Sequence, residues 1–300
     1  MPEKVGFLYS GSQNSLGRQF TKFKNALPGG ITLLPTGAAD DDYQRKLPDA
    51  ADRLINVENV KVLVAAGGPV SAFAARDATA KQTGPKTPVV FTSVTDPVGS
   101  GLYVVRGNLT GIAGMTTEMD AARLRLLQEL KPSISTVGVL RNPNRPNVDG
   151  QWNNLNQGRD KRLTLSPVDV GVKGTPGTPQ QIKDAFQNLP SVEALLVTAD
   201  PFFNSRRPDV IREVAQKTIP AIYQWREFVE EGGLMSFGPS LDEEYSAAAN
   251  YVGRILAGER PPNMPPLYQP TKFELVINLN TAKALNLAVP QTLLDRAEVI

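Results

Sequence analysis

The sequence predicts an α/β protein with two lobes, each built on a doubly wound parallel sheet. The first observation is a series of apolar, β-branched runs that do not alternate in polarity, as expected of parallel strands covered on both faces. The second is that amphipathic segments of helical period separate these runs. The third is a pause at GNLTGIAGM, residues 107–115, after which the series starts again. Together they favour two lobes with a cleft between them.

Each expected element follows from its own stretch of sequence. The expected strands, in chain order, are 5–9, 60–66, 88–94, 136–141, 194–199, 221–224, 234–238 and 272–279. The expected helices between them are 16–27, 43–55, 118–130, 208–218 and 241–257. The last of these begins after the capping-box pattern of Ser240 and Glu243, and Gly258 suits its C-terminal stop.

Composition removes several classes of function. The 300 residues contain no histidine and no cysteine, which excludes cysteine nucleophiles, Ser-His-Asp triads and ordinary zinc sites. The net charge of +2 gives no electrostatic reason to expect nucleic acid or an anionic membrane as partner. No loop has a Walker motif or a full dinucleotide fingerprint, so no nucleotide cofactor is expected. No metal site is expected either.

Ligands of parallel sheets bind beyond the carboxyl ends of the strands. The loops expected there are GSQNS (11–15), GGPVS (67–71), SVTDPVGSG (93–101), RNPNRPN (141–147), ADPFFNS (199–205) and YQWRE (223–227). Small residues let the backbone approach a ligand, and a loop that leads into a helix offers free N–H groups to a carboxylate. The candidate ligand-binding residues are Gly11, Ser12, Gly67, Gly68, Pro69, Thr92, Ser93, Asp96, Arg141, Asn142, Asp200, Pro201, Phe202, Phe203, Tyr223 and Phe237.

Several of these candidates also have a purely structural interpretation. The Gly-Gly-Pro turn at 67–69 is either a carboxylate-binding loop or a tight βα turn. Asp96 and Asp200 each precede a proline, where an Asp side chain often caps nearby backbone, although two such residues in different lobes favour a ligand role for one of them. At 202–203, we expect one Phe ring to stack on a ligand and the other to pack into the core.

The motifs resemble a known family. FTSVTDPVGSGLY with GNLTG, LLQELKPSISTVGVLRNPN, LLVTADPFF, IPAIYQWREFVEEGGLMSFGPS and PTKFELVINLNTAKALNLAVPQTLLDRAEVI occur in family order from about residue 60 onward. They resemble the ABC-transporter substrate-binding proteins with the type I periplasmic binding fold, some of whose members bind tryptophan or phenylalanine. ADPFF is less polar than the corresponding loop expected in the amino-acid-binding members.

The resemblance implies two Rossmann-like lobes joined by three crossovers, with a ligand held between them. It implies that lobe one comprises 1–112 and 241–265, and that lobe two comprises 113–240 and 266–300. Carried over position by position, the ligand-contacting residues are Ser12, Gly68, Ser93, Asp96, Asn142, Asp200 and Phe202.

The expected function is that of a solute receptor, not an enzyme. Open and closed arrangements of the lobes would interconvert, and an aromatic, carboxylate-bearing or amine-bearing ligand would stabilise the closed one. The expected partner is an ABC permease, and the receptor is expected to be a monomer outside the cytoplasm. MPEKVGFLYS contains no signal-peptide pattern, so an export signal is expected to have been removed. The alternatives are a cytoplasmic two-lobe sensor and a carboxylate-based α/β enzyme.

Overall fold

The chain folds into two compact units, each made from two separate stretches of sequence. The computed structural model describes residues 2–10, 17–38, 43–94, 97–98, 101–104, 107–114, 119–145, 148–174, 177–264 and 272–300. Unit 1 comprises Met1–Met115 and Leu241–Thr271, and unit 2 comprises Thr116–Ser240 and Lys272–Ile300. The chain therefore passes between the units three times.

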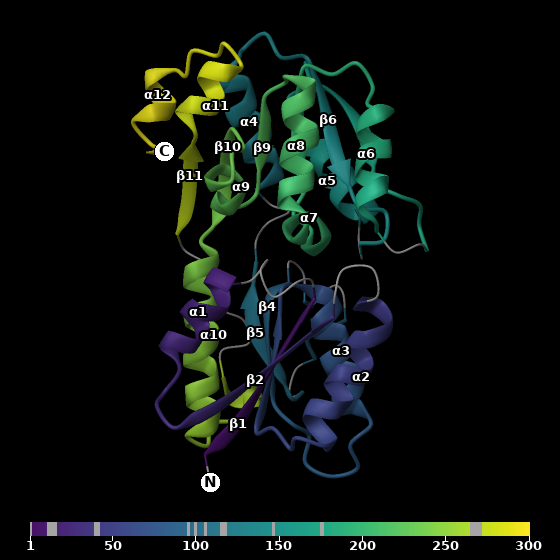
Figure 1. Ribbon diagram of the computed structural model, residues 1–300, viewed down its shortest axis with the longest axis vertical. Helices are drawn as coiled ribbons and strands as arrows, with labels where there is room; N and C mark the ends of the chain where they lie inside the picture. Colours follow the sequence, from purple (N-terminus) through teal and green to yellow (C-terminus); the bar gives the residue numbers. More distant parts are fainter. Residues whose placement is uncertain are drawn as a thin grey trace. The chain divides into compact units, whose positions relative to one another are not determined.

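Unit 1 is a parallel sheet with helices on both faces. Its described strands are β1 (Glu3–Ser10), β2 (Ile31–Ala38), β3 (Val62–Ala66), β4 (Val89–Val94) and β5 (Leu109–Ala113), in the order β2-β1-β3-β4-β5. Its helices are α1 (Gly17–Ala26), α2 (Tyr43–Asn56), α3 (Pro69–Ala80), α10 (Leu241–Leu256) and the short η2 (Pro261–Asn263). Figure 1 shows α2 and α3 on one side of this sheet and α1 and α10 on the other.

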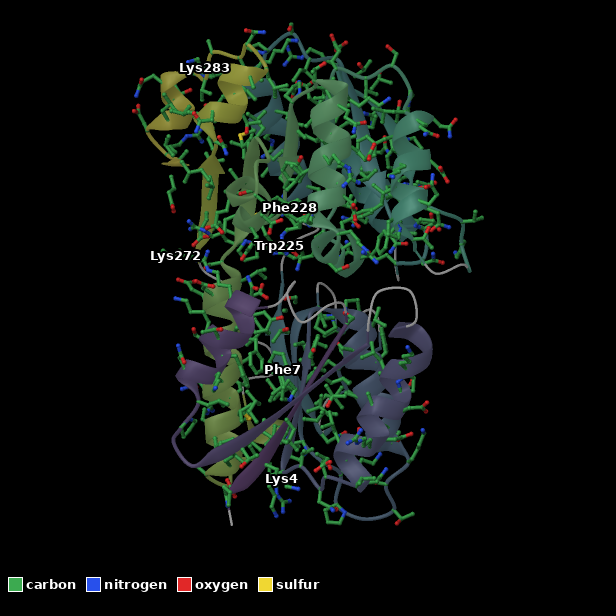
Figure 2. All side chains as sticks on the ribbon, viewed as in Figure 1. Lys4, Phe7, Trp225, Phe228, Lys272 and Lys283 are labelled. Carbon is green, nitrogen blue, oxygen red and sulfur yellow. The ribbon has the colours of Figure 1, made fainter. Side chains whose placement is uncertain are left out.

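Alternate residues of the unit 1 strands feed two separate cores. Leu63 and Ala65 pack in the core beneath α2 and α3, whereas Val62 and Val64 pack in the core beneath α1 and α10. Phe7, labelled in Figure 2, is fully buried in the second core. Side chains on successive strand residues point to opposite faces, so a strand covered on both sides must be apolar throughout.

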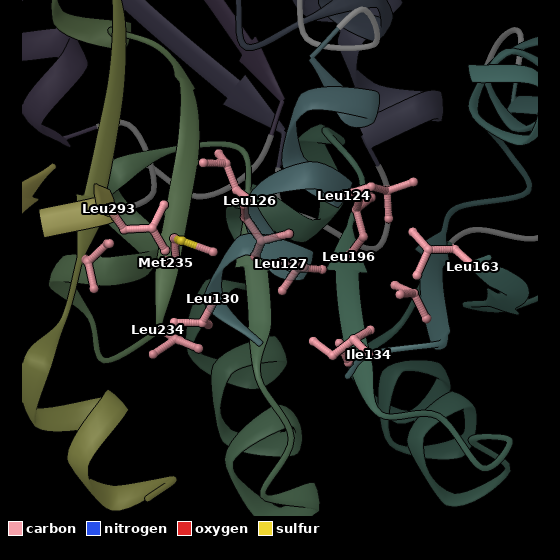
Figure 3. Close-up of a cluster of buried hydrophobic side chains, with 14 of the residues drawn as sticks. Leu124, Leu126, Leu127, Leu130, Ile134, Leu163, Leu196, Leu234, Met235 and Leu293 are labelled. Carbon is pink, nitrogen blue, oxygen red and sulfur yellow. The ribbon is translucent and has the colours of Figure 1, made fainter. Parts of the chain in front are cut away.

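Unit 2 is a larger sheet of mixed direction. Its described strands are β6 (Thr136–Arg141), β7 (Thr164–Asp169), β8 (Ala194–Val197), β9 (Ala221–Tyr223), β10 (Met235–Pro239), β11 (Phe273–Ile277) and β12 (Glu298–Val299), in the order β12-β11-β10-β9-β8-β6-β7. Its helices are α4 (Asp120–Leu130), α5 (Val148–Gly158), α6 (Pro179–Gln187), α7 (Pro201–Ser205), α8 (Arg207–Lys217), α9 (Arg226–Glu230), α11 (Leu279–Ala284) and α12 (Gln291–Leu294). Figure 3 shows the core under α4, where Leu124, Leu127 and Leu130 are buried near Leu196 and Met235.

The expected α/β class and its strand runs are confirmed, but β2, β7 and β12 were not expected, and two further differences concern β11 and β5. β11 pairs antiparallel with β10, so the unit 2 sheet is not wholly parallel as expected. The pause at 107–115 contains a strand, β5, which pairs in parallel with β4. The expected helix stop at Gly258 is confirmed, because this residue has the positive φ of 102° that favours glycine after a helix.

Candidate functional site

In unit 1, the turn between β3 and α3 depends on two glycines at the carboxyl edge of the sheet. Gly67 has φ 80° and Gly68 has φ 112° with ψ −165°, and the second combination is essentially restricted to glycine. The N–H of Gly67 donates to Oγ1 of Thr92 at 3.1 Å. Three of the predicted residues therefore lie together: Gly67 and Gly68, which follow β3, and Thr92 in the neighbouring strand β4.

The first turn of α3 is left without a side-chain cap. Gly68 occupies the N-cap position and Pro69 follows in the first turn, where proline is well tolerated because its missing N–H would have no helical partner. Ser71 steadies this turn by donating to the carbonyls of Ala66 at 2.6 Å and Gly68 at 3.0 Å. An uncapped helix start suits a carboxylate group.

At the end of β4, Ser93 has an uncommon backbone conformation. Its φ is 57°, in the left-handed region that serine rarely occupies. Its Oγ donates to Oε2 of Glu244 at 2.7 Å, and Glu244 lies at 1% exposure in α10. A buried carboxylate from the second stretch of unit 1 thus holds a predicted residue. Gly11, Ser12 and Asp96 lie outside the described residues.

In unit 2, Asp200 and Asn142 meet at the carboxyl ends of β8 and β6. Asp200 caps α7 by accepting the N–H of Phe202 at 2.8 Å, and its Oδ1 accepts Nδ2 of Asn142 at 3.2 Å. Both side chains are buried. Burial raises the pKa of the Asp200 carboxyl, while the Arg145 charge and the hydrogen bond from Asn142 act to lower it. The pair is a buried acceptor site at the sheet edge where ligands of this architecture bind.

A network of side-chain hydrogen bonds extends from Arg145 to α4. Arg145 donates to Oε1 of Gln151 at 3.2 Å, and Nε2 of Gln151 donates to Oδ2 of Asp120 at 2.6 Å. Asp120 pairs with Arg123 at 2.5 Å, and Nε of Arg123 donates to the carbonyl of Phe237 at 2.7 Å. This network links the loop after β6 to β10.

The two phenylalanines of the ADPFF loop both lie inside unit 2. Phe203 is fully buried and Phe202 is 4% exposed, with ring centroids 5.8 Å apart. A Cβ on Gly177 would lie 3.0 Å from the Phe202 ring, so this ring packs against the backbone there. Stacking of either ring on a ligand stays a prediction. Pro201 is the first residue of α7.

Three other predicted residues have partners within the chain. Both Nε and Nη2 of Arg141 donate to the carboxylate of Asp169 at 2.9 Å. The guanidinium group of Arg141 therefore already binds a carboxylate within unit 2. Tyr223 is buried with its ring stacked on Phe228 at 4.8 Å, and burial raises its pKa. The Phe237 ring is half-buried, and the backbone carbonyl of Phe237 accepts the hydrogen bond from Nε of Arg123.

Some of the site was not predicted from sequence. Glu244 lies 151 residues from Ser93, and no local motif signals that contact. Arg145 was within a predicted loop, 141–147, but was not selected there. Asp120 and Gln151 lie on α4 and α5, where a polar residue usually indicates an exposed face.

Two α/β units, each formed by two stretches of chain and each presenting polar loops at the carboxyl edge of its sheet, define the class of two-lobed α/β binding proteins. Within that class, the sequence profile of the ABC transporter substrate binding protein family matches residues 40–300. The chain belongs to this family. Its fold is the type I periplasmic binding fold.

The tyrosine-binding protein of Clostridioides difficile is a curated relative, 27% identical over 236 residues. The match covers 77% of this chain and 65% of that relative. Among solved structures, a conserved domain protein from Vibrio cholerae is similar with a TM-score of 0.86 at 22% identity, covering 100% of this chain and 99% of the other. An ABC domain from Streptococcus pneumoniae in complex with L-Trp gives 0.82 at 22% identity, covering 99% and 100%.

Among the helices that the structure describes, none is both long enough and apolar enough to cross a bilayer.

Proposed function

We propose that this chain is the extracytoplasmic receptor of an ABC importer and that it binds a free amino acid with an aromatic side chain. Family membership supports the transport role. The tyrosine-binding relative and the structural neighbour in complex with L-Trp support the ligand class. The receptor would deliver its ligand to a permease and, lacking histidine and cysteine, would release it chemically unchanged.

The observation that carries the proposal is the buried pair of Asp200 and Asn142. Burial still raises the pKa of Asp200 despite its hydrogen bonds from Asn142 and Phe202 and the nearby Arg145 charge, and an α-ammonium group would offset this cost of burying the charge. In unit 1, the uncapped start of α3 beside Gly68 suits the α-carboxylate. A ligand bound by both units would favour a closed arrangement of the two.

The test is isothermal titration of L-tyrosine, L-tryptophan and L-phenylalanine into the parent protein and into Asp200→Asn. We expect the parent to bind at least one of the three and the variant to bind it roughly 100-fold more weakly, since removing one partner of a buried charge pair costs about 2–5 kcal/mol. Asp49→Asn, which changes an exposed carboxylate on α2, is the matched control and should bind like the parent.

The unliganded Asp200→Asn protein separates binding from folding. Burial raises the pKa of Asp200 above the ordinary 3.8. The folded state therefore loses stability as the pH rises from 3.8 to the pKa of the folded protein, because the carboxyl must ionise in a buried position. At neutral pH the variant should therefore be at least as stable as the parent. If no amino acid binds the parent, or if the variant binds as tightly as the parent, the proposed ligand site is wrong.

A further inference from the structure

Gln224 is a buried amide that lacks partners. Its side chain is 0% exposed, yet neither Nε2 nor Oε1 has a hydrogen-bond partner within the described part of the chain. The indole N–H of the adjacent Trp225, labelled in Figure 2, is likewise buried without a partner among those residues. Buried polar groups are almost always paired, so each exception calls for an explanation such as a ligand or a water.

The position of Gln224 places it at the candidate site of unit 2. It follows β9 directly, and β9 pairs with β8 on one side and β10 on the other. Extended by two residues, the register that joins Leu196 to Ile222 would bring Gln224 opposite Thr198, which precedes Asp200 by two residues. Gln224 and Asp200 therefore follow neighbouring parallel strands, with Gln224 deeper along the sheet.

Gly238 lets β10 pass close to the backbone of Gln224. A Cβ on Gly238 would lie 2.0 Å from the backbone oxygen of Gln224, so β10 passes against the end of β9 only because residue 238 has no side chain. The backbone of residue 224 is therefore fixed by the neighbouring strand, and its side-chain amide is fully buried. Such a group discriminates strongly, because a ligand that fails to pair with it leaves it desolvated and unsatisfied.

We propose that Gln224 is a specificity-determining residue that hydrogen-bonds a hydroxyl group on the ligand side chain. This inference rests on the proposed function, in which Asp200 binds the ammonium end. A primary amide offers both a donor and an acceptor, and a phenol hydroxyl pairs with both. An indole N–H would satisfy only the Oε1, and a phenyl ring would satisfy neither. The receptor should therefore prefer L-tyrosine to L-tryptophan, and L-tryptophan to L-phenylalanine.

The test compares Gln224→Met, an unbranched apolar replacement, with the parent protein. In titrations, the parent should bind L-tyrosine at least tenfold more tightly than L-phenylalanine. The variant should lose tenfold or more of its affinity for L-tyrosine and keep its affinity for L-phenylalanine, so that the preference disappears. Its unliganded form should melt at the same temperature as the parent or higher, because an unpaired buried amide has been removed.

Thr110→Val is the matched control. Thr110 lies in β5 of unit 1 and also has a fully buried side-chain oxygen without a partner in the described residues. Its replacement should leave the preference for L-tyrosine unchanged. A tyrosine preference that survives Gln224→Met overturns the inference while leaving the proposed function intact.

The stability of the unliganded variants tests the premise of an unpaired amide separately from the proposed function. Loss of stability in both Gln224→Met and Gln224→Leu would mean that the amide is satisfied inside the protein, by a resident water or a shifted side chain, and would overturn the inference.

Discussion

Two Asp–Arg pairs with the same helical spacing show how burial decides what a charge contributes. Asp120 and Arg123 on α4 are 1% and 0% exposed, whereas Asp209 and Arg212 on α8 are 23% and 47% exposed. In water an ion pair gains little, because the solvent screens it. In the interior, removing one partner leaves the other charge without its compensation.

Asp120→Ala should therefore destabilise the protein by about 3–5 kcal/mol, the usual cost of breaking a buried ion pair from one side. Asp209→Ala, with the same spacing on an exposed helix face, should change stability little. The measurement is urea unfolding followed by circular dichroism. Equal effects from the two substitutions would show that burial is not the deciding factor.

Sequence reasoning predicts candidate residues near the carboxyl ends of strands. Thr92, Asn142 and Asp200 are such candidates, because polar residues at the carboxyl ends of parallel strands share one edge of a sheet. Glu244 and Gln224 were not selected, because the features that single them out are a contact across 151 residues and a missing hydrogen-bond partner. Neither feature exists before the chain is folded.

At the scale of elements, the β3–α3 turn depends on a backbone conformation that one residue supplies. Gly68→Ala places a Cβ at φ 112° and ψ −165°, and should destabilise the protein by about 1–3 kcal/mol. Gly84→Ala is the control, since a Cβ there meets nothing within 4 Å and the residue has no positive φ. Thermal unfolding of both variants tests this, and an undisturbed Gly68→Ala protein would contradict the expected strain.

Two of the strands that were not predicted from the sequence, β2 and β7, share one reason. β2 contains Pro35 and β7 contains Pro167, and proline lowers the strand signal because it cannot donate to a ladder. Both strands lie at an edge of their sheets, the position where proline is tolerated. An edge is a property of the assembled sheet, so the segment alone does not reveal that its prolines are acceptable.

At the scale of the whole molecule, the chain passes between units 1 and 2 three times, and the proposed function predicts a conformational change on ligand binding. Under that proposal, a ligand would stabilise one arrangement of the units only by its differential affinity for that arrangement. Each unit contributes its own candidate groups, Gly68 and Ser93 from unit 1 and Asn142 and Asp200 from unit 2.

Adding the amino acid that the parent binds should therefore lower the radius of gyration measured by small-angle X-ray scattering. At a free ligand concentration of 100 times Kd, binding to the folded state alone should add about 2.7 kcal/mol to its stability. Asp200→Asn at the same ligand concentration should show neither change. Tight binding with an unaltered radius of gyration would argue against closure.

The sequence by itself determined the α/β class, most of the strands and the loops from which the candidate site is drawn, because these depend on hydrophobic runs and turn residues a few positions apart. Only the tertiary structure decided that β11 runs antiparallel to β10, that Arg141 pairs with Asp169, that Phe203 is enclosed, and that Gln224 is buried without a partner. Each of these is a relation between segments distant in sequence, set by how sheets and helices pack, and burial and pairing have no value until that packing exists.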